Sequence, residues 1–107
     1  MAPQSETDVR REVDQQSALQ PFYHLVLLDD NDHTYQYVVE MLGRVLGYGR
    51  EKAFALACVV DASGEAIVET APEHQATRHQ AAIHAFGPDP LIARCLGSMS
   101  AVLRQAP

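Results

Sequence analysis

The stretch from Leu25 to Leu46 constrains the fold more than any other part of the chain, because it joins an apolar run, a crowded acidic turn and an amphipathic segment. Tyr23 to Leu28 is short, rich in aliphatic residues and bounded by turn formers, which predicts a buried strand. After the turn, apolar residues recur with helical spacing and predict a helix with one buried face. These residues are Val38, Met41, Leu42, Val45 and Leu46.

The acidic turn between these two elements carries Asp29, Asp30 and Asp32. Carboxylates this close repel one another, so the turn favours a nearby cation or full hydration. Part of the acidity has a structural explanation, because Asp32 or Thr34 can cap the helix that follows, and acidic side chains suit the positive end of its dipole. Capping does not account for all three carboxylates. The function of the turn therefore depends on which cation lies near it.

The remaining chain reads as an alternation of helices and strands. A glycine pattern at 47–49 ends the first helix and a second runs from Arg50 to about Asp61. A strand is predicted over Ala66 to Thr70, a third helix from Pro72 to about Phe86, and a last strand over Ser98 to Leu103. The order β-α-α-β-α-β has too few strands for a doubly wound sheet, so we predict an α+β sandwich.

Composition limits the classes of partner. With 107 residues, eight Lys and Arg in total and a formal net charge of −6, the chain offers no basic surface for nucleic acid or for an anionic membrane. Residues 1–20 have almost no large apolar side chain and predict a flexible N-terminal tail, followed by one domain over residues 21–107. No apolar run is long enough to span a membrane, and residues 1–20 lack the apolar core of a secretory signal, so we expect a cytoplasmic protein.

Two rival site classes find weaker support. Asp29, Asp30, Asp32 and His33 could ligate a metal, but the turn lacks the calcium-loop glycine, and we expect no metal or other cofactor. We also expect no enzyme, because Asp30, His33 and Asp61 have no nucleophile predicted beside them. Cys58 and Cys95 form no CxxC pair and are expected to be free thiols, Cys58 on an inner helix face and Cys95 in an exposed loop.

Three motifs in the right order resemble the ClpS family, adaptors that hand substrates with destabilising N-terminal residues to the Clp AAA+ protease. Residues 26–34 (VLLDDNDHT), running into VVEML at 38–42, resemble the family's aliphatic strand, Asn-Asp-Asp-x-Thr turn and helix. Residues 51–67 are similar to its E-[RK]-A … V-H-x-x-G-x-A segment, and Pro90-Leu91 matches a later pair. The resemblance covers residues 22–103 and implies a small antiparallel three-stranded sheet packed on three helices.

The resemblance also implies a binding site for a substrate's amino terminus. In the family, the turn and a His of the second helix hold the α-amino group and first peptide unit. The matching positions here are Asp30, Asn31, Asp32, Thr34 and Asp61. The pocket for the first side chain is implied to be lined by Val39, Ala57, Val60 and Leu91, with Tyr35 and Gln36 in place of the family's Pro-Met pair.

The departures from the family pattern change the expected chemistry. Asp30 stands where the family has Asn and Asp61 where it has His, and a carboxylate is a stronger acceptor for an ammonium than either. Ala57 replaces a pocket Met and leaves room, whereas Tyr35 is able to swing in and close the pocket. We predict that large apolar first residues still bind. The alternative is a ClpS-fold protein that only docks on the ATPase.

The implied partners are substrate proteins with destabilising N-terminal residues and the N-terminal domain of a Clp AAA+ ATPase of the ClpA or ClpC type. In the family, an acidic and a basic residue of the third helix contact that domain. Glu73 and Arg78 have suitable spacing here, and a one-residue shift of the alignment would make them His74 and His79. The segment 1–20 would correspond to the family's N-terminal extension, which takes part in delivery.

Overall fold

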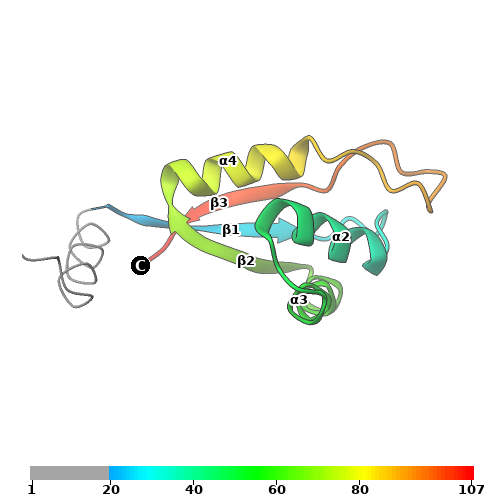
Figure 1. Cartoon of the computed structure of the whole chain (residues 1–107), viewed down its shortest axis with the longest axis horizontal. Coiled ribbons are helices and arrows are strands. Elements are labelled where there is room, and N and C mark those ends of the chain that lie inside the picture. The colour runs from blue at the N-terminus through cyan, green and yellow to red at the C-terminus, as the bar shows by residue number, and fades with distance from the viewer. Residues whose placement is uncertain (1–19) are drawn as a thin grey trace, which may run out of the picture.

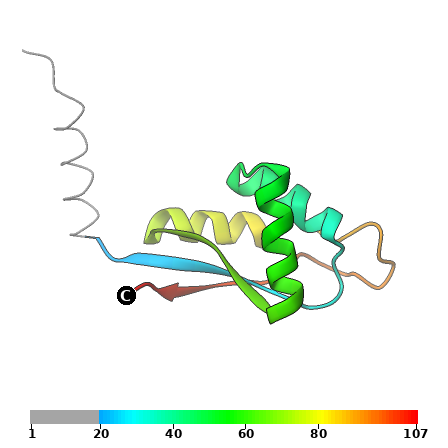
Figure 2. The ribbon, with the colours of Figure 1, turned by 90° about the horizontal axis from the view of Figure 1, so that it is seen from below.

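The computed structural model describes residues 20–107, in which a three-stranded antiparallel sheet carries three helices on one face (Figure 2). The elements, in the order shown in Figure 1, are β1 (Phe22–Leu28), α2 (Tyr35–Leu46), α3 (Arg50–Ser63), β2 (Glu65–Pro72), α4 (Glu73–His84) and β3 (Ala101–Gln105). The predicted α+β class and element order are confirmed. The predicted tail, except for Gln20, lies outside the described residues.

The apolar strand β1 occupies the centre of the sheet, whose order is β2-β1-β3. Both neighbours are antiparallel to it, with Leu27 opposite Ala66 of β2 and Ala101 of β3. A central strand has neighbours on both edges, which explains why residues 25–27 are fully buried. The register of β1 and β2 shifts between Leu25 and Val26, and this bulge changes which side chains of β2 face the helices.

The helix ends follow the predicted local signals. Thr34 is the N-cap of α2, and its hydroxyl accepts a hydrogen bond from the Tyr37 N–H at 3.1 Å. Gly47 ends the same helix with φ +73°, and Gly64 ends α3 with φ +82°, left-handed conformations that glycine adopts without steric cost. The three caps set where α2 begins, where it ends and where the chain turns from α3 into β2.

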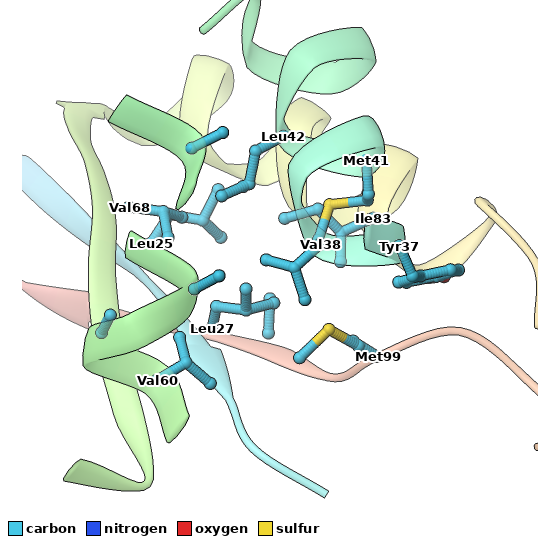
Figure 3. Packing of buried hydrophobic residues seen from close by; sticks show 14 residues of the cluster. Leu25, Leu27, Tyr37, Val38, Met41, Leu42, Val60, Val68, Ile83 and Met99 are labelled. Carbon is cyan, nitrogen blue, oxygen red and sulfur yellow. The ribbon is translucent and has the colours of Figure 1, made fainter. Parts of the chain in front are cut away.

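The core lies between the helices and the sheet face that they cover. In Figure 3, Val38 and Met41 of α2 gather with Leu27 of β1 and with Met99 around one apolar interior. Val60 brings α3 into the same cluster. Burying side chains of this size stabilises the fold by roughly 1.5–3 kcal/mol each, and it fixes the positions of α2 and α3 relative to the turn between β1 and α2.

Several predicted boundaries were wrong. The last strand begins at Ala101 rather than Ser98, although Met99 and Ala101 are buried as the alternating pattern predicted. The hydroxyl of Ser98 accepts a hydrogen bond from the Gly87 N–H at 2.6 Å, which ties residue 98 to the segment that follows α4. Strand β2 and helix α3 are longer than predicted, and α4 ends at His84, two residues before the predicted end at Phe86.

A long segment, the connecting loop (residues 85–100), joins α4 to β3 and packs against the start of α2. Its anchor is Asp89, which is only 2% exposed and accepts hydrogen bonds from the backbone N–H groups of Thr34 (2.6 Å) and Leu91 (2.9 Å). Burial by itself raises the pKa of Asp89, but these hydrogen bonds outweigh it and hold the pKa below its ordinary value. Asp89 therefore serves as an ionised, buried acceptor that fixes the N-terminus of α2.

Candidate functional site

The acidic turn folds on itself through its own side chains. The Asp29 carboxylate accepts a hydrogen bond from the Asn31 N–H at 3.1 Å, and the Asp30 carboxylate accepts one from the Asp32 N–H at 3.0 Å. Asn31 has φ +61° and, in residues 20–107, is the only residue other than glycine with a positive φ. Asn tolerates this conformation better than most residues, so it suits the tightest point of the turn.

Two of the three turn carboxylates have basic side chains as partners within the described chain. His33 Nδ1 lies 2.7 Å from Asp30, and Arg94 of the connecting loop lies 2.6 Å from Asp32 through its Nε. Arg94 also donates to the backbone carbonyl of Asn31 at 3.1 Å. Part of the predicted demand for a cation is thus met internally. Within residues 20–107, Asp29 has no such ion-pair partner.

A small cavity of about 170 Å³, here called the polar hollow, opens between the turn, α2 and α3. Asp29 faces it from the turn and Asp61 from the last part of α3. In the described part of the chain, neither carboxylate forms an ion pair with a Lys, Arg or His side chain. The hollow is lined by Asp29, Asn31, His33, Tyr35, Val38, Ala57, Val60, Asp61 and Met99.

Tyr35 reaches across from the first position of α2 to Asp61. Its hydroxyl donates a hydrogen bond to Asp61 Oδ2 at 2.5 Å. The hydrogen bond to a carboxylate, together with burial and the negative charges of Asp61 and Asp29, raises the pKa of Tyr35 to about 12. Tyr35 therefore stays protonated at neutral pH, and it acts as a hydrogen-bond donor to Asp61.

This contact predicts the titration of Tyr35. A raised pKa means that the hydrogen bond is intact at neutral pH and is lost only as pH rises toward about 12. In Asp61→Asn the charge is removed, so we expect the pKa to fall toward the ordinary tyrosine value of about 10. The pKa of Tyr35 is measured from the near-ultraviolet absorbance of the phenolate as a function of pH. Subtracting the curve of Tyr35→Phe removes the contribution of the other tyrosines. Identical Tyr35 titrations with and without the Asp61 charge would contradict the contact.

A second and larger hollow, the apolar groove, has a volume of about 620 Å³ and runs between α2 and the first turns of α3. The Tyr35 ring packs edge-on against Phe54, with centroids 5.5 Å apart. Phe54 is half exposed, an unusual position for a large aromatic side chain. The groove is lined by Tyr35, Gln36, Val39, Glu40, Gly43, Arg44, Tyr48, Arg50 and Phe54.

Only some of the residues predicted to bind the α-amino group lie at the polar hollow. Asn31 and Asp61 line the polar hollow, whereas Asp30, Asp32 and Thr34 do not. Asp30 and Asp32 turn toward His33 and Arg94, and Thr34 caps α2. Asp29 takes the place in the hollow that sequence reasoning gave to Asp30. The signal available was its position as the first residue after β1, adjacent to the matched motif.

The residues predicted for the first side chain are divided as well. Ala57 and Val60 line the polar hollow, Val39 and Gln36 line the apolar groove, and Tyr35 lines both. Leu91 is 62% exposed on the connecting loop and lines neither hollow. The loop that carries Leu91 is anchored by Asp89 and by the Arg94–Asp32 pair.

Cys95 lies on the connecting loop as predicted, but it is buried, with 8% of its surface exposed. Its Sγ lies 3.3 Å from His33 Nε2, and His33 in turn contacts Asp30. This carboxylate–imidazole–thiol sequence resembles the arrangement of nucleophilic sites, and the sequence did not predict it. Cys95 lines neither hollow, however, and its sulfur accepts the Asp89 N–H at 3.1 Å. The chain of contacts ties the connecting loop to the turn.

The described chain shows neither a metal-binding cluster nor a helix suited to span a membrane. Residues 20–107 contain no group of three or more His, Cys, Asp or Glu side chains arranged to hold a metal ion. Every helix in this part of the chain falls short of the length and apolar character that crossing a bilayer requires.

The residues predicted to contact the ATPase lie on two sides of α4. Glu73, His74 and Arg78 line a shallow surface groove of about 600 Å³ together with Gln20 and Pro21 at the start of the described chain. His79 instead turns toward the sheet, where its Nδ1 lies 2.7 Å from Glu69 and its side chain is 18% exposed. Of the two alternative pairs, only Glu73 and Arg78 both line that groove.

Comparisons with known proteins agree with the fold and the motifs. The family model described as "ATP-dependent Clp protease adaptor protein ClpS" matches residues 18–91. A similar solved structure is that of Agrobacterium tumefaciens ClpS2 bound to L-phenylalaninamide, with a TM-score of 0.70 and 15% sequence identity over 81% of this chain and 99% of that one. At this identity the likeness shows the fold alone. No curated protein matches the sequence.

Proposed function

Because this chain belongs to the ClpS family of Clp protease adaptors, we propose that it binds the free α-amino group and the large apolar first side chain of substrate proteins and delivers them to a Clp AAA+ ATPase. The observation that carries the proposal is the pair Asp29 and Asp61, which face one hollow from two elements without an ion-pair partner in residues 20–107. An adaptor of this kind needs an acidic socket beside an apolar surface.

The acidic socket suits an ammonium group. The α-amino group of a peptide has an ordinary pKa of about 7.7–8.0 and is largely protonated at neutral pH. It then offers three N–H donors, and the hollow offers the carboxylates of Asp29 and Asp61 and the side-chain amide of Asn31. A hydrogen bond between charged partners contributes roughly 1.5–3 kcal/mol net.

The apolar groove supports binding of the first side chain. Its volume of about 620 Å³ accommodates a Leu, Phe, Tyr or Trp side chain, and Val39 and Phe54 supply apolar contact area. Burying such a side chain contributes roughly 1.5–3 kcal/mol, and after ordering costs the sum corresponds to an affinity on the order of micromolar. The Agrobacterium protein of the same fold is bound to L-phenylalaninamide, which carries both a free α-amino group and an aromatic side chain.

Binding of fluorescent peptides tests this function directly. Peptides that begin with Leu or Phe are expected to bind with a free amino terminus and to lose at least about tenfold in affinity when that terminus is acetylated, since acetylation removes the charge. Fluorescence anisotropy with the full chain measures both. Equal binding of free and acetylated peptides would rule out the acidic socket and favour an adaptor that only docks on the ATPase.

Delivery requires a second surface, which we place on the outer face of α4. Glu73 and Arg78 carry opposite charges and line the shallow groove beside Pro21, so they offer a mixed-charge contact for the ATPase N-terminal domain. Gln20 and Pro21 line this groove, and we propose that the segment before them takes part in delivery. We expect charge reversal at Arg78 to abolish binding to the ATPase and to leave peptide binding unchanged. This result would show that the two partners bind different surfaces.

A further inference from the structure

Tyr35 occupies the boundary between the two hollows. Of the residues that line the polar hollow and the apolar groove, it is the only one common to both. Its hydroxyl is bonded to Asp61 on one side, and its ring packs against Phe54 on the other. With the hydroxyl in this position, the tyrosine forms a wall between the place suited to an ammonium and the place suited to a large apolar side chain.

The contacts that hold this wall are few and lie at the surface. Tyr35 is 39% exposed and Phe54 is 50% exposed, so neither ring is locked by surrounding core. The backbone at this point is fixed, because Thr34 caps the helix and its N–H donates to Asp89. Movement of Tyr35 therefore means rotation of its side chain, without a change in α2.

Asp61 remains able to bind a cation while it holds Tyr35. The hydroxyl uses Oδ2, and in the described residues Oδ1 forms no hydrogen bond. A carboxylate accepts several hydrogen bonds through its two oxygens. An ammonium with only a small side chain attached can therefore bind at Asp61 and Asp29 without displacing the tyrosine.

We propose that Tyr35 is the specificity-determining residue of the site, a gate that must leave Asp61 before a large first side chain can pass from the polar hollow into the apolar groove. The gate rests on the proposed function, because it presupposes that the polar hollow takes an amino terminus. It discriminates against large first residues by the free energy needed to break the Tyr35–Asp61 contact, and it leaves small first residues unaffected.

Peptides that differ only in the first residue test the gate. Affinities of the full chain are measured for peptides beginning with Phe, Leu and Ala, each free and acetylated, in wild type, Tyr35→Phe and Tyr35→Ala. In Tyr35→Phe we expect affinity for Phe-first and Leu-first peptides to rise about three- to tenfold, the range open to a partly exposed hydrogen bond to a charge, with less than about twofold change for Ala-first peptides. Tyr35→Ala should likewise raise the affinity for Phe-first and Leu-first peptides relative to that for Ala-first peptides.

Tyr23→Phe is the matched control, because Tyr23 lies on β1 and lines neither hollow. A uniform change for all first residues would overturn the gate, since it would mean that the hydroxyl only competes for Asp61. A loss of affinity for Phe-first peptides would overturn it as well, since the hydroxyl would then be a substrate contact. If wild type prefers free over acetylated peptides but the Phe-to-Ala ratio stays constant among variants, the gate fails and the proposed function stands.

Discussion

Asp61→Asn is expected to weaken binding of a free amino terminus by about tenfold or more. The asparagine has the same shape and its amide oxygen still accepts the Tyr35 hydroxyl, so the change removes charge and little else. A hydrogen bond between charged groups contributes roughly 1.5–3 kcal/mol, and each 1.4 kcal/mol corresponds to about a factor of ten in affinity. Anisotropy titrations with a free Ala-first peptide, whose binding does not require Tyr35 to leave residue 61, measure the loss, and the acetylated peptide should show none.

Asp32→Asn is the matched control for this experiment. It removes one negative charge from the same region, but Asp32 is paired with Arg94 and does not line the polar hollow. We expect less than about a twofold effect at physiological salt, because exposed charges at a distance are screened. Equal losses in the two variants would mean that the overall negative field attracts the peptide and that Asp61 has no special place.

A comparison of Asp29→Asn with Asp30→Asn distinguishes the structure from the family alignment. The alignment assigns the ammonium contact to Asp30, whereas the structure places Asp29 in the hollow and Asp30 on His33. We therefore expect the larger loss of affinity in Asp29→Asn. A larger loss in Asp30→Asn, with an unchanged melting temperature, would favour the alignment.

The second large effect is expected at Asp89, where Asp89→Ala should lower the free energy of unfolding by about 2–3 kcal/mol at pH 7. The substitution removes the buried acceptor of the backbone N–H groups of Thr34 and Leu91. It also removes the tie between the connecting loop and the first turn of α2. Urea unfolding followed by circular dichroism measures the change.

The pH dependence identifies the cause of that loss. The pKa of Asp89 is lower in the folded protein than in an unfolded chain, so ionised Asp89 stabilises the fold at pH values above the unfolded value of about 3.9. This stability is lost as pH falls through the folded-state pKa, and wild type and Asp89→Ala should approach each other there. Glu65→Gln, which removes the exposed Arg104 partner, should barely change the unfolding midpoint. A constant difference between wild type and Asp89→Ala at all pH values would contradict an electrostatic role.

Much of the fold was predictable because its signals are local. The apolar run that becomes β1, the Thr34 cap and the Gly47 stop each act within a few residues of the chain. They fixed the strand–turn–helix unit and, with the later elements, the α+β class. The start of β3 was missed because the alternation of apolar residues continues through Met99, although residues 98–100 lie outside the strand and Ser98 contacts Gly87, eleven residues earlier.

The candidate site was only partly predictable because its carboxylates are distinguished by distant partners. Asp32 is neutralised by Arg94, sixty-two residues later in the chain, and His33, the partner of Asp30, is held by the connecting loop through the Gly97 carbonyl. Neither contact has a signature in the spacing of residues near the turn. Likewise, His79 of α4 contacts Glu69 of β2 and is largely buried there, which the helical spacing of α4 alone did not predict.

The sequence by itself determined the order of elements, the family and the presence of an acidic turn at the mouth of a helix, since all three depend on neighbouring residues and their periodicity. Only the tertiary structure decided that Asp29 and Asp61 face one hollow and that Tyr35 lies between this hollow and the apolar groove. The physical reason is that a carboxylate's direction and partner are set by backbone dihedrals and by charges brought in from remote segments. Those contacts exist only once the core has placed α2, α3 and the connecting loop together.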